Sequence, residues 1–234
     1  MKVSIHQPNY LPWIGYFNKL DQSDCFVFLD KADVSKGSVL NRNYILSPNG
    51  KTLLTVPLKK GEKAIHQVQI NNSRNWRVKH WATIEASYKK SPYWPLYKDR
   101  FQQIYEKEWE YLCELNIALI TLICELLTID VKIYRESDFY DDFGKGSERI
   151  ANIVAKLKGT TYISGSGGKK YNNREDFEEK GIELMYQHLT HPVYEQLWGD
   201  SFTEKLSVID LLFTHGPHSI EIIRSTRNPL VKDL

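Results

Sequence analysis

The first seventeen residues, MKVSIHQPNYLPWIGYF, constrain the fold more than any other stretch of this chain. The apolar residues Val3 and Ile5 lead into a polar segment at residues 6–10, and Pro12 then opens an apolar segment that includes Trp13. This order predicts a strand, a rigid loop and a helix at the start of an α/β fold. The loop would lie at the carboxyl edge of the first strand, where open parallel sheets bind ligands.

The composition is that of an ordinary globular protein, with 41% hydrophobic and 26% charged residues in a chain of 234. A formal net charge of +2 gives no electrostatic argument for nucleic acid as a partner. The longest apolar stretch, residues 115–127, is interrupted by Asn116 and Glu125 and is too short to span a bilayer. The N-terminal residues lack the apolar core of a signal peptide, so we expect a cytoplasmic protein without membrane insertion. The three cysteines lie in apolar settings and fit reduced thiols in that compartment.

Apolar runs that alternate with helical periodicity predict a mainly parallel sheet with helices between its strands. The expected strands are residues 2–5, 25–29, 131–134, 161–164 and 182–186. The expected helices are residues 13–20, 76–89, 97–106, 111–127, 147–157, 206–213 and 219–224. Ser73 is expected to cap the second helix.

The dipeptide Asn49-Gly50 between two alternating segments predicts an antiparallel hairpin, with residues 66–70 as a third strand. We therefore expect one α/β domain over residues 1–234, with a mainly parallel sheet core. The hairpin would be inserted at about 41–70, and a helical segment would follow at about 74–128.

A glycine-rich turn follows the expected strand at residues 161–164. Its residues are Ser164, Gly165, Ser166, Gly167, Gly168, Lys169 and Lys170. Glycines let backbone N–H groups converge on an anion, and the lysines add positive charge, so we expect this turn to hold a phosphate. The spacing matches neither a Walker loop nor a dinucleotide-binding fingerprint. The alternative is a surface turn with solvated lysines.

His6 and Asp30 end the first two strands, and we expect both to be catalytic. An imidazole can act as a general base or contact a phosphate near neutral pH. Asp30 can orient that imidazole or bind a sugar hydroxyl. The structural alternatives are a histidine bonded to a nearby loop backbone and a carboxylate that caps the following loop.

Further substrate-binding candidates lie in other polar loops. The first loop carries three hydrogen-bonding side chains, Gln7, Asn9 and Tyr10. Arg42, in the segment that also holds Lys36, is the best phosphate or carboxylate clamp because a guanidinium forms bidentate bonds. A solvated shoulder of the hairpin is the alternative for Arg42. His191 can face a ligand after the last strand, but with His188 it lacks a third ligand of standard spacing, so no metal site is expected.

Six segments of the chain together resemble the WbqC-like protein family. They are HQPNYLPWIGYF from residue 6, NRN at 41–43, KHW at 79–81, YISGSGGKKY at 162–171, HPVYEQ at 191–196 and LSVIDLLF at 206–213. The resemblance is collinear and spans nearly the whole chain. Such proteins look like bacterial components associated with O-antigen and other surface-polysaccharide gene sets. The resemblance implies that setting for this chain and assigns no catalytic residue.

The resulting hypothesis is a transferase of O-antigen and lipopolysaccharide biosynthesis that moves a group onto a nucleotide-linked amino sugar. The reaction type comes from the resemblance, with His6 as base, Asp30 orienting it, and the glycine-rich turn holding a phosphate. The expected partner is a phosphorylated or nucleotide-linked sugar, with no cofactor, no metal and no nucleic acid. One alternative is a non-catalytic ligand-binding or scaffolding protein of the same pathway. Another is a nucleotidyl-transfer-like enzyme, against which the lack of a His-x-Gly-His pattern counts.

Overall fold

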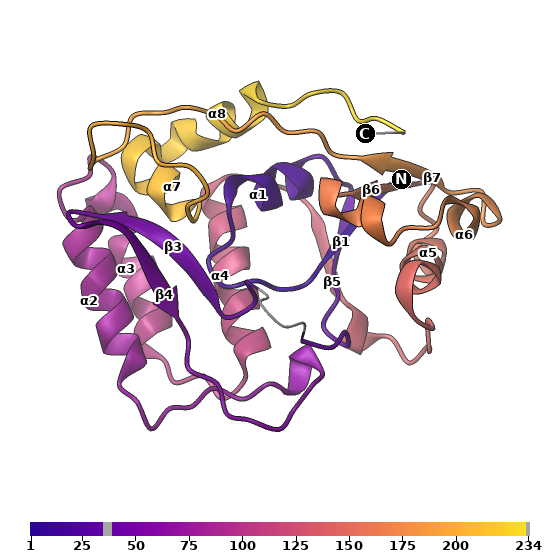
Figure 1. Ribbon diagram of the computed structural model, residues 1–234, viewed down its shortest axis with the longest axis horizontal. Coiled ribbons are helices and arrows are strands. Elements are labelled where there is room, and N and C mark those ends of the chain that lie inside the picture. The colour runs from indigo at the N-terminus through magenta and orange to yellow at the C-terminus, as the bar shows by residue number, and fades with distance from the viewer. Residues whose placement is uncertain (35–38, 233–234) are drawn as a thin grey trace.

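Five parallel strands form the central sheet of this protein, in the order β5-β2-β1-β6-β7. The computed structural model describes residues 1–34 and 39–232 (Figure 1). The strands of the sheet are β1 (Lys2–His6), β2 (Cys25–Phe28), β5 (Lys132–Arg135), β6 (Thr161–Ser164) and β7 (Glu183–Tyr186). The predicted parallel core is therefore confirmed. The apolar run of β2, which is buried throughout, suits a strand that is covered on both faces.

Helices cover both faces of this sheet (Figure 1). They are α1 (Ile14–Asp21), α2 (Trp76–Tyr88), α3 (Trp94–Glu106), α4 (Leu112–Leu126), α5 (Gly146–Lys156), α6 (Arg174–Glu178), α7 (Ile209–His215) and α8 (Ser219–Ser225). Among the described residues, no helix combines the length and apolar character that a membrane crossing requires. The short helix α6 was not predicted from the sequence, and Asn173 caps it by accepting a hydrogen bond from the Glu175 N–H.

Alternate residues along the strands pack into two separate hydrophobic layers, one on each face of the sheet. Val3 and Ile5 of β1 pack with side chains of α5 and α6 on one face. Phe26 and Phe28 of β2 pack on the other face, in a larger layer that includes α1, α4, α7 and α8. Cys25, Cys113 and Cys124 are free thiols within these buried layers.

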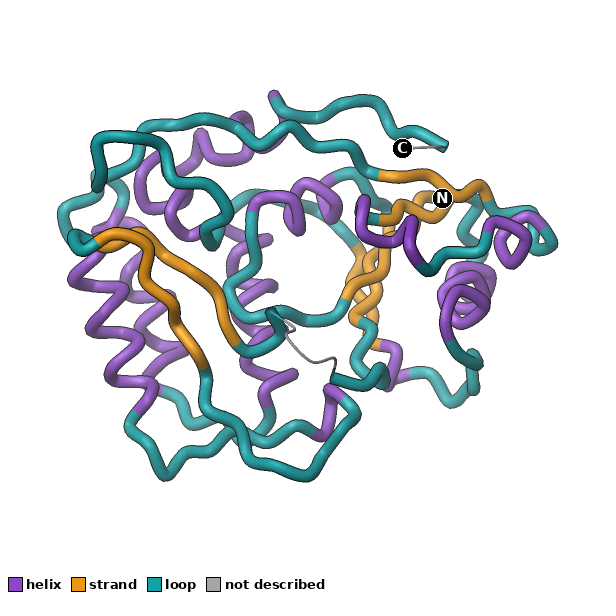
Figure 2. Tube along the Cα trace, viewed as in Figure 1, coloured by secondary structure: helices purple, strands orange, loops and turns teal. Residues whose placement is uncertain are grey.

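The strands β3 (Arg42–Ser47) and β4 (Gly50–Thr55) form a second, antiparallel sheet away from the parallel one (Figure 2). Gly50 has a φ of +90°, which a glycine adopts without steric cost at the turn. The predicted hairpin is confirmed, but its predicted third strand at residues 66–70 is wrong. A 3₁₀ helix, η1 (Ile65–Gln67), begins that segment, and Gln69 and Ile70 form only single bridges to two different partners.

One predicted helix cap and one predicted helix start are also wrong. Asn75 precedes α2 and makes no side-chain capping bond, while the Ser73 hydroxyl donates to Asn71 Oδ1 at 2.6 Å. Helix α7 begins at Ile209 and not at residue 206. Ser207 bridges Trp13 and the Val208 N–H donates to the Pro12 carbonyl at 2.9 Å, so these residues belong to a contact with the first loop.

Candidate functional site

The strand order creates a topological switch point between β1 and β6. The chain passes from β1 to β2 and then to β5 on one side, and it returns to place β6 and β7 on the other side of β1. Neighbouring strands at such a point send their loops in opposite directions and leave a crevice at the carboxyl edge, where ligands bind. The loop after His6 and the glycine-rich turn after Ser164 both begin there.

His6 ends β1 and is half-buried among aromatic rings. Its Nδ1 lies 3.0 Å from the Gln7 carbonyl oxygen, which can only accept, so Nδ1 carries the proton. The rings of Trp13 and Tyr16 pack edge-on at 5.7 and 4.8 Å between centroids. Burial, together with the positive charge of Lys19, lowers the pKa of His6 from 6.5 to about 3. The imidazole is therefore neutral near pH 7, and its Nε2 has no hydrogen-bond partner among the described residues.

The predicted ligand-binding residues of the loop after His6 differ in burial, and some of them belong to the protein core. Gln7 is half-buried, and its carbonyl also accepts from the Tyr16 hydroxyl at 3.1 Å. Asn9 is only 2% exposed, yet its amide group has no hydrogen-bond partner among the described residues. Tyr10 is fully buried, with its hydroxyl 2.8 Å from His80 Nδ1 and 2.6 Å from the Tyr105 hydroxyl. These contacts favour a packing role for Tyr10 over contact with a ligand.

The glycine-rich turn is a 3₁₀ helix, η3 (Ser166–Lys170), rather than an open loop. The Ser164 hydroxyl donates to the Gly165 carbonyl at 3.1 Å and accepts from Asn172 Nδ2 at 3.0 Å. A Cβ at Gly168 would lie 2.1 Å from Ser164 Oγ, so the fold requires glycine at that position. Three side chains of this helix are exposed to solvent, those of Ser166, Lys169 and Lys170.

The two side chains that end β1 and β6 leave opposite faces of the sheet. Ser4 pairs with Ile163, so Ser164 shares the face of Ile5, which belongs to the layer of α5 and α6. The His6 imidazole instead points toward α1, where it contacts Tyr16. The loops therefore adjoin through their backbones, and the Ser164 hydroxyl is not beside the imidazole.

Asp30 does not contact His6. Its carboxylate accepts from Arg135 Nε at 3.1 Å, from the Ser137 hydroxyl at 2.6 Å and from the Ser137 N–H at 2.9 Å. The side chain is fully buried, and Arg135 also donates to Glu114 at 2.7 Å. A buried carboxylate needs such partners. The structure thus gives Asp30 the role of joining the ends of β2 and β5, and the pairing of His6 with Asp30 that the sequence suggested is not formed.

Arg42 and His191 lie on other segments and make no contact with His6 or the glycine-rich turn. Arg42 begins β3, and its half-buried guanidinium forms no hydrogen bond or ion pair among the described residues. His191 Nδ1 donates to the Pro192 carbonyl at 2.8 Å, and its ring packs on Phe202 at 5.6 Å. Lys36 lies outside the described residues. Within the described ranges, no three His, Cys, Asp or Glu side chains gather as a metal site would require.

Lys19 is the residue of this site that sequence reasoning missed. It is 3% exposed in α1, and its ammonium donates to the Ile5 carbonyl at 3.0 Å. Burial lowers the pKa of Lys19 from 10.5 to about 7. The available signal was a lone lysine in a short apolar helix, which a sequence alone cannot tell from a lysine that reaches solvent.

Four of the family-like segments meet in pairs inside the protein. Segment 79–81 meets the first loop where His80 contacts Tyr10. Segments 191–196 and 206–213 meet at Asp210, whose carboxylate accepts from Tyr88, Tyr194 and Gln196 at 3.0 Å each. Burial raises the pKa of Asp210, while these donors oppose the shift. The segments are therefore held together by buried polar networks as well as by the sheet edge.

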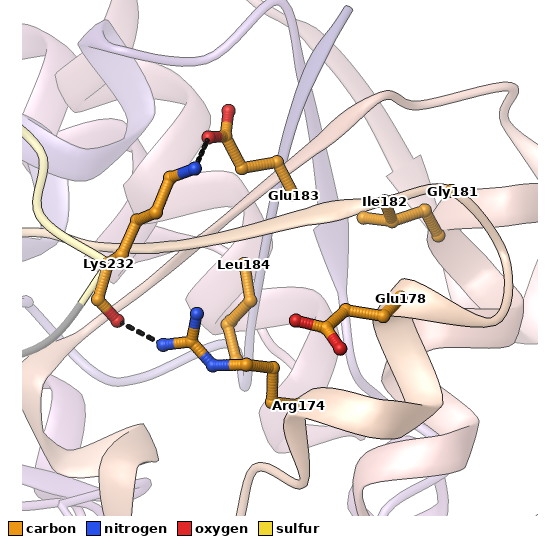
Figure 3. A pocket seen from close by; sticks show the side chains of 7 residues that line it. All are labelled: Arg174, Glu178, Gly181, Ile182, Glu183, Leu184 and Lys232. Atoms are coloured by element: carbon orange, nitrogen blue, oxygen red, sulfur yellow. Dashed lines mark hydrogen bonds and ion pairs between the residues drawn. The ribbon is translucent and has the colours of Figure 1, made fainter.

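Two surface hollows lie away from the switch point. One, of about 310 Å³, is beside the amino end of β7, and Figure 3 shows Lys232 reaching Glu183 and Arg174 reaching the Lys232 carbonyl there. Both distances are 2.8 Å. The other, of about 410 Å³, lies between α3 and α4, where the Lys107 ammonium is 4.2 Å from the centre of the Trp109 ring. No predicted site residue lines either hollow.

Comparison with known proteins agrees with the resemblance seen in the sequence. The model of the WbqC-like protein family matches residues 7–222. A protein of Mycobacterium tuberculosis (strain ATCC 25618 / H37Rv), named uncharacterized protein Rv1507c, is 32% identical over 231 residues. That match covers 97% of this chain and 99% of the mycobacterial protein. No solved structure matches the chain.

Proposed function

Since the chain belongs to the WbqC-like protein family, we propose that it acts on a nucleotide-linked sugar in bacterial surface-polysaccharide biosynthesis. The reaction we propose is transfer of a group onto an amino sugar, as in the assembly of O-antigen and lipopolysaccharide. The family supports the setting of this proposal. The switch point is the observation that supports the proposed binding location, because the loop after β1 and the glycine-rich turn after β6 lie next to each other there.

In this proposal the glycine-rich turn binds a phosphate of the nucleotide sugar. Lys169 and Lys170 are exposed there and supply positive charge, and charge-assisted bonds to phosphate are stronger than neutral ones. His6 accepts a hydrogen bond from a ligand hydroxyl at Nε2, because its other ring nitrogen is already bonded to Gln7. The half-buried Trp13 ring beside it offers an apolar face to a sugar.

A second candidate is a binding protein without catalysis, and the state of His6 favours it. An imidazole whose pKa is about 3 holds a proton poorly at neutral pH, which weakens its case as a general base. Asp30, the proposed partner of that base, is bonded to Arg135 and Ser137. A catalytic version of the site would therefore need another proton acceptor, whereas ligand binding needs none.

A thermal-shift screen tests the shared part of both candidates. Nucleotide sugars, acyl-CoA compounds and nucleoside triphosphates are compared, and a ligand at 100 times its Kd should stabilise the protein by about 2.7 kcal/mol. The double variant Lys169→Ala/Lys170→Ala should then bind the stabilising nucleotide sugar more weakly, by about 1.5–3 kcal/mol for each charge-assisted bond that the substitutions remove. Unchanged affinity in that variant by calorimetry would contradict a phosphate site at the turn.

Turnover separates the two candidates once a ligand is known. A transferase should release a modified sugar when the bound nucleotide sugar is incubated with acceptor compounds, and mass spectrometry detects the product. A ligand that binds at the switch point and is recovered unchanged with every donor class would favour the non-catalytic candidate.

A further inference from the structure

Lys19 is a buried cation without an anionic partner among the described residues. Its side chain is 3% exposed, and its one hydrogen bond within that part of the chain goes to the Ile5 carbonyl. An ammonium has three donors, so two of them have no acceptor in the described structure. Burying a charge is costly unless it is paired, which makes an unpaired lysine in a protein interior unusual.

The ammonium lies at the switch point itself. The His6 carbonyl accepts from the Leu29 N–H beside β2, and consecutive carbonyls of a strand point to opposite sides, so the Ile5 carbonyl is directed to the β6 side. The last pair between β1 and β6 is Ser4 with Ile163. Lys19 therefore donates to a carbonyl one residue beyond that pair, where the two strands stop pairing.

Within residues 1–34 and 39–232, no carboxylate near Lys19 is available to neutralise it. The titratable and charged groups on the surrounding elements are His6 on β1, Tyr16 and Asp21 on α1, Asp24 before β2, Arg224 on α8 and Arg227 after it. Asp21 pairs with Arg224 and with Arg227. Asp24 is exposed and accepts from the Lys2 N–H at 2.7 Å.

Two further polar groups in the adjoining loop have no partner in the described part of the protein. Asn9 is 2% exposed and its amide makes no hydrogen bond there, and His6 Nε2 is an unused acceptor beside the Trp13 ring. A bound ligand would supply partners to both groups. Together with Lys19, these groups provide one cation, one amide and one acceptor at the end of the same strand.

We propose that the Lys19 ammonium is the counter-charge for a phosphoryl group of a ligand bound at the carboxyl ends of β1 and β6, and that binding is accompanied by proton uptake at Lys19. This inference rests on the proposed function, since it names a second phosphate contact in the same site. A lysine suits this role because its ammonium acts as a point charge toward phosphate oxygens.

The direction of proton movement follows from the state of Lys19 in the free protein. Burial lowers its pKa to about 7, so near neutral pH a large share of the molecules carry an uncharged amine. A nearby anion favours the charged form and raises the pKa. Ligand binding thus takes up protons near pH 7, and affinity falls as the pH rises above that value.

Sulfate tests this inference, because it is a tetrahedral dianion whose own charge is constant near neutral pH. The lysine Cε resonances of the wild-type protein are followed by NMR as a function of pH, with Lys19 assigned through its backbone. We expect a Lys19 midpoint near 7 without sulfate. Saturating sulfate should raise that midpoint by about one pH unit or more. Resonances of exposed lysines away from the site should not move.

Two matched variants test whether the charge itself binds the anion. Lys31 is a suitable control because it also donates to a backbone carbonyl, that of Phe139 at 2.8 Å. Thermal shifts at increasing sulfate concentration should show affinity about tenfold weaker or worse in Lys19→Met, as for loss of one charge-assisted bond. Lys31→Met should behave like the wild type. If Lys19→Met does not fold, the wild-type titration alone decides.

A Lys19 midpoint that stays the same with sulfate would overturn the inference, and so would equal sulfate affinity in the two variants. The outcome is separable from that of the proposed function. If sulfate raises the Lys19 midpoint while no nucleotide sugar binds, the proposed function fails and the Lys19 site stands. If a nucleotide sugar binds through Lys169 and Lys170 but leaves the Lys19 midpoint unchanged, the Lys19 site fails alone.

Discussion

The pKa of His6, at about 3 in the folded protein against 6.5 for a free imidazole, makes this side chain a source of acid sensitivity. Between these two values the unfolded chain binds more protons than the folded one, so stability is complete above about pH 6.5 and falls as the pH decreases toward 3. Each pH unit in that window should cost about 1.4 kcal/mol. His6→Gln cannot bind the proton and should lose less stability on acidification.

Urea unfolding at several pH values measures this difference, and His218→Gln serves as the control. His218 is also a histidine, and its side chain is 68% exposed, so His218→Gln controls for the replacement of an imidazole away from the strand end. Parallel slopes for His6→Gln and the wild type would show that the imidazole is not held neutral by its surroundings.

At this scale the sequence predicts where a residue lies along the chain better than what it contacts. The position of His6 at a strand end is predictable because the apolar run before it and the prolines after it are local signals. Lys19 could not be recognised, since its burial and its bond to the Ile5 carbonyl depend on how α1 packs against β1. The partner of Asp30 was equally hidden, because Arg135 is 105 residues away.

The 3₁₀ helix that follows β6 has no room for a side chain at Gly168, but it has room for one at Gly167. A Cβ at Gly168 would lie 2.1 Å from Ser164 Oγ and 2.9 Å from Asn172 Nδ2, whereas at Gly167 no atom lies within 4 Å. Gly168→Ala should therefore destabilise the protein by about 1–3 kcal/mol through overpacking. Gly167→Ala should be neutral or slightly stabilising, because it restricts the unfolded chain. Urea unfolding of the pair checks this, and equal losses would contradict the role assigned to Gly168.

Elements with strong local patterns were predicted well, and those defined by distant partners were not. The run CFVFL and the long apolar helix α4 are recognisable from a single window of sequence. Residues 66–70 alternate like a strand, but Ile70 bridges Leu58 and Gln69 bridges Tyr111, so no continuous ladder forms. The glycine-rich turn was located correctly, while its helical form follows from bonds such as Gly168 N–H to the Gly165 carbonyl.

On the scale of the whole molecule, the sequence indicated parallel strands but not their order. β1 is the central strand, and its neighbour β6 pairs Thr161 with Lys2 although the two residues lie at opposite ends of a long intervening chain. Which of the later strands takes that place is decided by packing of the two layers, which no local window contains. The carboxyl edge was therefore predictable as the place of a candidate site, but the switch point between β1 and β6 was visible only in the folded protein.

The pairing of β1 with β6 determines which parts of the fold can form early during synthesis. As the chain leaves the ribosome, the hairpin can form early, because Arg42 and Thr55 pair across a short turn. One edge of β1 stays unpaired until Thr161 of β6 has been synthesised. Pulse-labelled hydrogen exchange during refolding should show hairpin amides protected before the β1 amides that face β6. Simultaneous protection would contradict this order. Nascent and truncated chains are thus the forms most exposed to aggregation, because they lack the β6 strand that covers this edge of β1.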